Sequence, residues 1–445
     1  MYALKPLKVY LLEGAADDPR AQARMERILD AIGYPMADVV TFSAKTLPEV
    51  SREVVEQWPP EEVPEGTHET WMRPLVFTSL KFTPERPQFA ELVAACPKGV
   101  ALGMIWDFLG YIDNYRPYHK RKDDWETDYV CWPTWDFGVM SGCPHGCRYC
   151  GSGTHGRYIA LGLNLEDYME HVVEPKVLKE SWQSCFRLIS WGADVPAFEP
   201  EYGAFELYLT KLDELDRYGY FHSNADNFDW VENVACRDRL IGIWSISGEG
   251  QASLIEPGAP SAAARVDAMA KLTEWGVPFR PKFKPIIPVK TWREDCAGCI
   301  QDIFERSEPE SLGFCVYMWN SFQSMSDTLD LELMDPEMVT AARESADEME
   351  GVRTGPFPHE VRAEVYRTLA AEARKYDKDV PLFISTESRE MWDEMAPVLG
   401  QDPKYFFCGC SSVALPGRKL ALSEECPHST FAPHGFEPSE VEDDG

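Results

Sequence analysis

Three cysteines close together carry the clearest chemistry in this sequence. Cys143, Cys147 and Cys150 follow the spacing C-x3-C-x2-C in a stretch punctuated by glycine. A short glycine-containing loop can turn three thiolates toward one centre, and thiolates at close quarters favour zinc or an iron–sulfur cluster. A structural zinc site uses four protein ligands, whereas a [4Fe–4S] cluster held by three thiolates leaves one iron open for a small molecule. The spacing predicts such a cluster, and a zinc loop completed by His145 or by a distant cysteine is the alternative.

This spacing resembles the signature of the radical S-adenosylmethionine (SAM) superfamily. Tyr149 also fits the aromatic position directly before the third cysteine. The resemblance implies that Cys143, Cys147 and Cys150 hold a [4Fe–4S] cluster whose open iron chelates SAM, with Tyr149 beside the cofactor. It further implies that SAM is cleaved reductively to a 5′-deoxyadenosyl radical, which abstracts hydrogen from a substrate. A one-electron donor such as flavodoxin or ferredoxin is the implied partner.

Composition and charge narrow the class of protein. The chain has 445 residues, 44% hydrophobic and 26% charged, which is ordinary globular composition and enough for two or three domains. We find no signal-peptide pattern and no apolar run of membrane-spanning length, so we expect a cytoplasmic protein with no membrane partner. The 13 cysteines then indicate reduced thiols and metal. A net charge of −31 opposes binding to phosphate backbones, so a small molecule or peptide fits better than DNA.

Alternating strands and helices predict the fold class, which is α/β. Residues 1–125 are expected to form an N-terminal α/β domain, with strands at 8–12, 38–42 and 75–78 and a helix at 18–33. Residues 126–330 are expected to form a partial (β/α)6 radical SAM barrel, because strands and helices alternate there. The six expected strands lie at residues 135–140, 186–191, 220–224, 240–247, 278–288 and 312–319. Residues 331–445 are expected to form a helical, cysteine-containing extension with a late strand at 380–385 and an acidic tail.

The order of segments also resembles the spore photoproduct lyase family, whose members reverse a thymine dimer in DNA. The clearest stretch is Ile255-Glu256-Pro257-Gly258, after the fourth barrel strand. The resemblance implies four SAM-contacting positions, which are Asp194, Asn224, Ser245 and Lys284. Their types suit the role, because a carboxylate accepts a hydrogen bond from the methionine ammonium and a lysine neutralises its carboxylate.

Departures from that family argue against the same reaction. Trp191 stands where the lyase has the cysteine that returns a hydrogen atom to the product radical, and Gly151 stands where it has a second tyrosine. We therefore consider Cys315, on the sixth strand, as a substitute donor. Lesion repair in DNA stays as an alternative function, and a zinc-stabilised protein without catalysis is the other.

Cysteines outside the motif form two further groups. Cys408, Cys410 and Cys426 lie near the C-terminus, and Cys296 and Cys299 form a C-x2-C pair. The C-terminal group predicts a second iron–sulfur cluster or a zinc, which the C-x2-C pair could complete. Alternatively, Cys408 or Cys410 reaches into the barrel as the missing hydrogen donor, or all five are reduced thiols.

Overall fold

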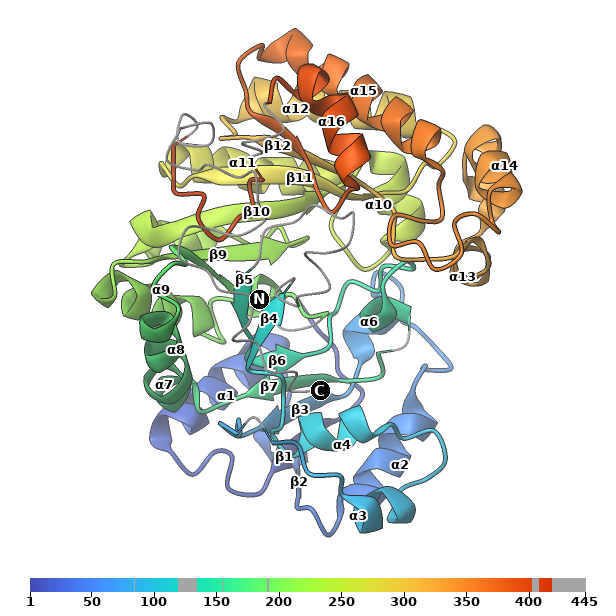
Figure 1. Ribbon diagram of the computed structural model, residues 1–445. Helices are drawn as coiled ribbons and strands as arrows, with labels where there is room; N and C mark the ends of the chain where they lie inside the picture. The colour runs from blue at the N-terminus through green and yellow to red at the C-terminus, as the bar shows by residue number, and fades with distance from the viewer. Residues whose placement is uncertain (84, 119–133, 155, 190–191, 402–407, 418–445) are drawn as a thin grey trace.

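Two β-sheets form the framework of the protein, one with five strands and one with eight. The computed structural model describes residues 1–83, 85–118, 134–154, 156–189, 192–401 and 408–417. Figure 1 shows the smaller sheet in the lower half of the molecule and most of the larger sheet in the upper half. Within these ranges, no helix has the length and apolar character needed to cross a membrane.

The five-stranded sheet has the strand order β2–β1–β3–β7–β6. Its strands are β1 (Val9–Leu12), β2 (Val40–Phe42), β3 (Leu75–Thr78), β6 (Met140–Ser141) and β7 (Ile159–Gly162). All neighbours are parallel except the antiparallel pair β6 and β7. The three strands expected before residue 125 are therefore confirmed.

Helix α1 (Pro19–Ile32) confirms the helix expected at 18–33. Its N-cap residue, Asp18, accepts a hydrogen bond from the backbone nitrogen of Arg20, and its C-cap residue, Gly33, has a φ of 65°. Glycine adopts that left-handed conformation without steric cost, so it ends the helix cleanly. The other helices of this region are α2 (Leu47–Gln57), α3 (Ala90–Ala95) and α4 (Leu102–Phe108).

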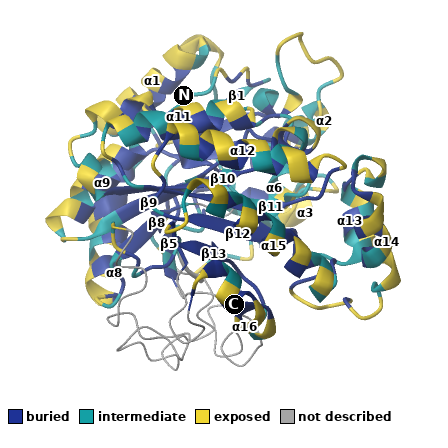
Figure 2. Ribbon diagram, turned by 90° about the horizontal axis from the view of Figure 1, so that it is seen from above, coloured by how far each residue is buried: buried dark blue, intermediate teal, exposed yellow. Residues whose placement is uncertain are grey.

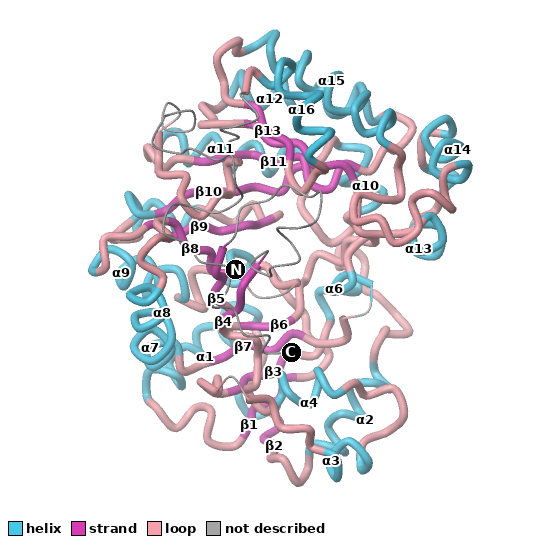
Figure 3. The backbone as a smooth tube through the Cα atoms, in the orientation of Figure 1, coloured by secondary structure: helices cyan, strands magenta, loops and turns pink. Residues whose placement is uncertain are grey.

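The eight-stranded sheet has the order β13–β12–β11–β10–β9–β8–β5–β4. Its strands are β4 (Tyr115–Tyr118), β5 (Thr134–Phe137), β8 (Cys185–Leu188), β9 (Tyr218–Ser223), β10 (Leu240–Ile246), β11 (Phe279–Ile286), β12 (Leu312–Val316) and β13 (Leu382–Ile384). Every neighbouring pair is parallel except β4 and β5. The tube drawing in Figure 3 shows the strands from β8 to β13 stacked one above another.

The six strands predicted for the barrel are confirmed, in sequence order and in one sheet. The late strand expected at 380–385 extends this sheet as β13. The two sheets do not divide the chain at residue 125, because β6 and β7 come after β5 in the sequence and pair in the smaller sheet. The strand expected at 135–140 accordingly ends at Phe137, and the chain crosses to the other sheet before Met140.

The helices that pack against strands of the large sheet include α9 (Ala204–Glu214), α11 (Ala262–Glu274), α15 (His359–Tyr376) and α16 (Arg389–Leu399). The other helices of this part of the chain are α6 (Gly151–Thr154), α7 (Leu165–Tyr168), α8 (Glu174–Lys179), α10 (Glu249–Ile255), α12 (Trp292–Arg306), α13 (Phe322–Thr328) and α14 (Pro336–Glu344). Figure 2 shows buried strands beneath helices whose outer sides are exposed. Phe221 of β9 packs against Phe205 of α9. Because side chains alternate along a strand, Tyr220 points to the opposite face, which we call the inner face.

Candidate functional site

The cysteine loop lies where the two sheets meet. The chain leaves the large sheet at Phe137, pairs briefly in the small sheet as β6, and then enters the loop that ends at α6. Gly142 has a φ of 87°, and a Cβ atom there would lie 2.3 Å from the backbone oxygen of Tyr158. Only glycine tolerates both conditions, so Gly142 fixes the turn that starts the loop.

The three thiols of the loop are partly or fully buried. Burial raises the pKa of the Cys143 and Cys147 thiols, and nearby negative groups, including Cys150, raise it further. Thiolates are therefore unfavourable here unless a positive centre compensates them, as the iron atoms of a cluster would. In the described part of the chain, no three or more histidine, cysteine or carboxylate side chains converge on a single metal ion. A [4Fe–4S] cluster differs because each thiolate binds its own iron atom, and the three thiols fit such a group.

A buried arginine donates hydrogen bonds to the backbone of the cysteine loop. Arg73, 1% exposed, lies just before β3. Its guanidinium donates hydrogen bonds to the backbone oxygens of Cys143, Ser152 (3.0 Å) and Gly153 (2.7 Å). Burial lowers the pKa of Arg73. Among the neighbouring charges that oppose this shift, that of Cys143 has the largest effect. Arg73 therefore fixes both ends of the loop and places a positive group near its thiols.

The segment that most resembles the lyase family packs directly against the cysteine loop. The backbone nitrogen of Arg148 donates to the oxygen of Ile255 (2.9 Å), and Gly258 donates to the oxygen of His145 (2.8 Å). A Cβ atom on Gly258 would lie 2.5 Å from that His145 oxygen and 2.7 Å from the oxygen of Pro144. Glycine is thus required for close contact between two backbones.

We expect Gly258→Ala to lower the free energy of unfolding by about 1–3 kcal/mol, because the added methyl group overlaps backbone atoms. The matched control is Gly298→Ala in α12, where a Cβ atom meets nothing within 4 Å. That control should be stable or gain up to about 1 kcal/mol, because alanine favours a helix. Urea unfolding under anaerobic conditions compares the two variants, and equal stability would contradict the packing argument.

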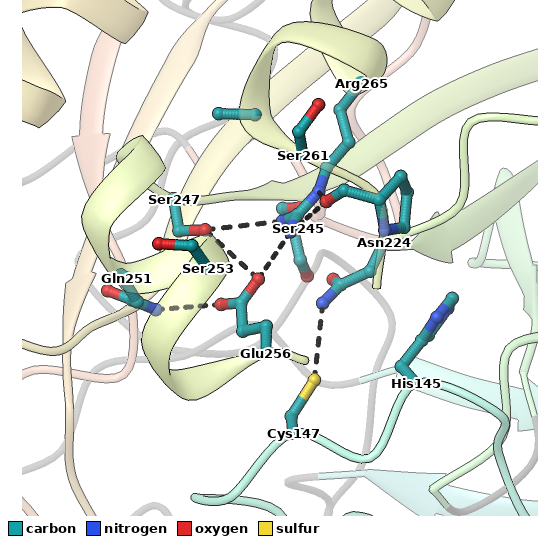
Figure 4. Close-up of polar contacts among 12 residues, drawn as sticks. His145, Cys147, Asn224, Ser245, Ser247, Gln251, Ser253, Glu256, Ser261 and Arg265 are labelled. Atoms are coloured by element: carbon teal, nitrogen blue, oxygen red, sulfur yellow. Dashed lines mark hydrogen bonds and ion pairs between the residues drawn. The ribbon is translucent and has the colours of Figure 1, made fainter. Parts of the chain in front are cut away.

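Behind the loop lies a buried polar cluster centred on Glu256, shown in Figure 4. Its carboxylate accepts hydrogen bonds from Arg265 (2.5 Å), Gln251 (2.9 Å), Ser247 (3.1 Å) and the Tyr149 hydroxyl (3.4 Å). Arg265 and Glu256 are 0% and 2% exposed. Burial alone would lower the pKa of Arg265, but the charge and the hydrogen bond of Glu256, together with the nearby Tyr149 and Cys147, outweigh burial, and the pKa is raised. This ion pair connects the loop to the end of β10.

Asp194 joins the loop to the end of β9. One carboxylate oxygen accepts from the Ser223 hydroxyl (2.7 Å), and the other accepts from His145 Nε2 (2.7 Å) and the Asn224 backbone nitrogen (2.8 Å). Its side chain is buried. The Asn224 amide in turn lies 3.8 Å from the Cys147 sulfur. Asp194 therefore orients His145 and Asn224, and its predicted contact with SAM stays a prediction.

We expect Asp194→Asn to cost about 1–3 kcal/mol of unfolding free energy, because one amide NH2 group would face a buried donor. Asp229→Asn is the control, since Asp229 pairs with Lys271 on the surface and surface pairs contribute little. Thermal unfolding measures both. If Asp194→Asn were as stable as its control, the proposed role in orienting His145 would be wrong.

The remaining predicted site residues lie on strands of the large sheet. Ser245 is on β10, and its backbone oxygen accepts from Arg265 (3.3 Å). Lys284 is on β11, with its nitrogen 4.9 Å from the centroid of the exposed Trp319 ring. Cys315 is fully buried on β12, where its sulfur lies 3.4 Å from the Thr386 hydroxyl. Tyr149, Asp194 and Asn224 thus gather at the loop, whereas Lys284 contacts Trp319 and Cys315 contacts Thr386.

The C-terminal cysteines are only partly described. Cys408 and Cys410 lie side by side, and Cys410 packs against Tyr220 and its neighbours on the inner face. Cys426 and Trp191 lie outside the described residues. Cys296 and Cys299 are buried in α12 within the main hydrophobic core. The second cluster or zinc therefore has no support from this arrangement.

Solved structures match this fold, whereas no protein-family model and no curated protein sequence matches the chain. One match is a spore photoproduct lyase double mutant with bound AdoMet and dinucleoside spore photoproduct, with TM-score 0.56, 14% identity, and coverage of 86% of this chain and 99% of that chain. Another is spore photoproduct lyase complexed with the dinucleoside spore photoproduct, with TM-score 0.55 and the same identity and coverage. The chain thus has a radical SAM fold. Specifically, it has the fold of spore photoproduct lyase, and that prediction is confirmed.

Sequence reasoning missed the residues that hold the loop in place. Arg73 and Arg265 belong to no recognisable motif, so neither was predicted to lie near the site. Glu256 was noted only as part of a resembling stretch. A usable signal existed for Gly258, because a glycine after proline in a resembling segment suggests close backbone approach.

Proposed function

We propose that this protein is a radical SAM enzyme in which Cys143, Cys147 and Cys150 hold a [4Fe–4S] cluster. The observation that carries the proposal is one buried loop with three thiols, set between two sheets in the fold of spore photoproduct lyase. When bound, the cluster and SAM would supply a 5′-deoxyadenosyl radical that abstracts hydrogen from a substrate.

The residues around the loop have separate roles in this proposal. Arg73 and the Glu256–Arg265 pair fix the loop, so that its thiols need not reorganise when they bind iron. Asp194 orients Asn224, whose amide is within reach of Cys147. Tyr149, Asn224 and Ser245 would bind or orient SAM, and Lys284 lies further along the sheet, beside Trp319.

We infer a small molecule or a peptide as the substrate, because the chain carries a net charge of −31. Repair of a DNA lesion is the alternative, supported by the fold and opposed by that charge. Of the predicted hydrogen donors, the neighbouring cysteines Cys408 and Cys410 are favoured over Cys315. The Cys410 sulfur lies beside the Cys408 sulfur and a lysine on the inner face, while Cys315 is enclosed by core side chains.

Anaerobic reconstitution tests the proposal. Iron and sulfide are counted per chain, and SAM cleavage under dithionite is assayed. We expect about four irons in the wild type, and loss of both iron and cleavage in the Cys143→Ala/Cys147→Ala/Cys150→Ala variant. A Cys96→Ala/Cys236→Ala variant is the control, because these partly exposed cysteines lie outside the loop, and it should keep both.

Two results would overturn the proposal. Zinc without iron or sulfide in the wild type would favour the zinc-stabilised protein. SAM cleavage that survives in the triple variant would show that the loop cysteines do not hold the catalytic cluster. Saturable DNA binding that weakens steeply with salt would instead favour the DNA substrate.

A further inference from the structure

The segment at residues 408–417 packs against the N-terminal ends of strands β8 and β11 of the large sheet. The backbone nitrogens of Ser184 and Cys185 donate to the oxygen of Ser412 (2.9 and 2.8 Å). Arg280, near the start of β11, donates to the oxygens of Gly409 (2.7 Å) and Ala414 (2.9 Å). These contacts hold the C-terminal cysteines in a fixed position against the inner face.

Two sulfur atoms of this segment and the ammonium group of Lys282 on β11 lie close together. The Cys408 and Cys410 sulfurs are 3.2 Å apart, and the Lys282 nitrogen lies 3.3 Å from the Cys410 sulfur. Lys282 is 1% exposed. The hydrogen bond with Cys408 lowers the pKa of Cys410 well below its usual value, and the charges of Lys282 and two other cations lower it further against the opposing effect of burial. A thiolate at Cys410 is therefore favoured, with the shared proton on Cys408.

We propose that Cys408 and Cys410 are a redox-active pair that forms a reversible disulfide on the inner face of the large sheet. The co-reactant is a linear disulfide of the glutathione class. The Cys410 thiolate attacks one of its sulfurs, which forms a mixed disulfide and releases one thiolate. The Cys408 sulfur then attacks the Cys410 sulfur of that mixed disulfide, so the second thiolate leaves, with the Cys408 proton passing to one of the two released thiolates. The pair loses two electrons, and the co-reactant gains them.

A catalytic use of this pair rests on the proposed function. If a product radical takes the hydrogen atom of one thiol, the remaining sulfur radical can bond to the neighbouring thiolate. The disulfide radical anion so formed passes its extra electron to a one-electron carrier of the ferredoxin or flavodoxin class, which leaves the disulfide. A dithiol reductant then restores both thiols. SAM would be consumed as a co-substrate, because the hydrogen atom does not come back from 5′-deoxyadenosine.

The chain contains a matched control pair. Cys296 and Cys299 are both buried in α12, and burial raises the pKa of Cys296 to about 12 and that of Cys299 well above its usual value. Thiol–disulfide exchange needs a thiolate, so this pair should stay reduced under conditions that oxidise Cys408 and Cys410.

The test equilibrates the full chain anaerobically with mixtures of reduced and oxidised glutathione. Acid quenching, alkylation and trypsin then separate the two pairs, because cleavage after Lys404 and Arg418 isolates one and cleavage after Arg293 and Arg306 isolates the other. We expect the first peptide to lose two hydrogens and escape alkylation at oxidising ratios, reversibly, while the second is alkylated at both cysteines. Lys282→Met should shift the pH profile of the oxidation rate upward by about one pH unit, because one neighbouring charge is worth about one pKa unit, and Lys282→Arg should reverse most of that shift.

Several results would overturn the inference. One is two free thiols at Cys408 and Cys410 at every ratio. Another is equal oxidation of both pairs, which would show unspecific chemistry. A third is stoichiometric zinc or iron lost on Cys410→Ser, which would assign the sulfurs to a metal. SAM cleavage is measured separately, so a chain that forms the disulfide without cleaving SAM contradicts only the proposed function, and one that cleaves SAM with both thiols free contradicts only the pair.

Discussion

Arg73→Met is expected to destabilise the cysteine loop and to lower iron retention after reconstitution. The substitution keeps an unbranched side chain of similar length but removes three hydrogen bonds to the backbone oxygens of Cys143, Ser152 and Gly153. Each buried oxygen left without a donor costs about 1–3 kcal/mol, so we expect a loss of about 3 kcal/mol or more. The positive charge near the thiols is lost as well, which disfavours an anionic cluster there.

Two further variants test whether the effect is specific to the arginine at position 73. Arg73→Lys retains the charge but not the planar fork that reaches several oxygens, so it should recover iron retention better than stability. Arg20→Met removes an arginine on the surface, paired with Asp18, and should change neither property. Urea unfolding and iron counting measure the two properties separately. Full iron retention and wild-type stability in Arg73→Met would show that the loop is held without this residue.

The second large effect is expected at the buried Glu256–Arg265 ion pair. Removing one partner leaves an unpaired charge in the interior, which costs about 3–5 kcal/mol. Arg265→Met and Glu256→Gln should therefore each be strongly destabilised. The double variant should lose clearly less than the sum of the two, because neither charge then remains buried alone.

Urea unfolding of the four proteins of this double-mutant cycle measures the coupling. The comparison pair is Arg239 and Asp213, whose carboxylate is exposed, and its cycle should give less than about 1 kcal/mol. Equal coupling in the two cycles would contradict the role assigned to the buried pair. Loss of the ion pair should also affect the cysteine loop, because the Tyr149 hydroxyl of that loop donates a hydrogen bond to Glu256.

Local patterns in the sequence predicted the cysteine loop and most of the strands. The C-x3-C-x2-C spacing places three thiols in one loop whatever the rest of the chain does, because the covalent chain limits their separation. The alternation of strand and helix segments likewise predicted six of the eight strands of the large sheet, and the strand at 380–385 was predicted as well. The spacing did not show that Met140 and Ser141 leave the large sheet, because a two-residue strand has no period of its own.

Which distant side chains meet was decided only by the tertiary structure. Arg73 reaches the loop across 70 positions of the chain, and Lys282 reaches Cys410 across 128. Such contacts depend on the crossing between two sheets and on the path of the C-terminal segment, and neither leaves a periodic signal in the sequence. The sequence by itself therefore determined the chemistry of the thiols, and only the packing of remote segments decided their neighbours, because burial and charge act through space rather than along the chain.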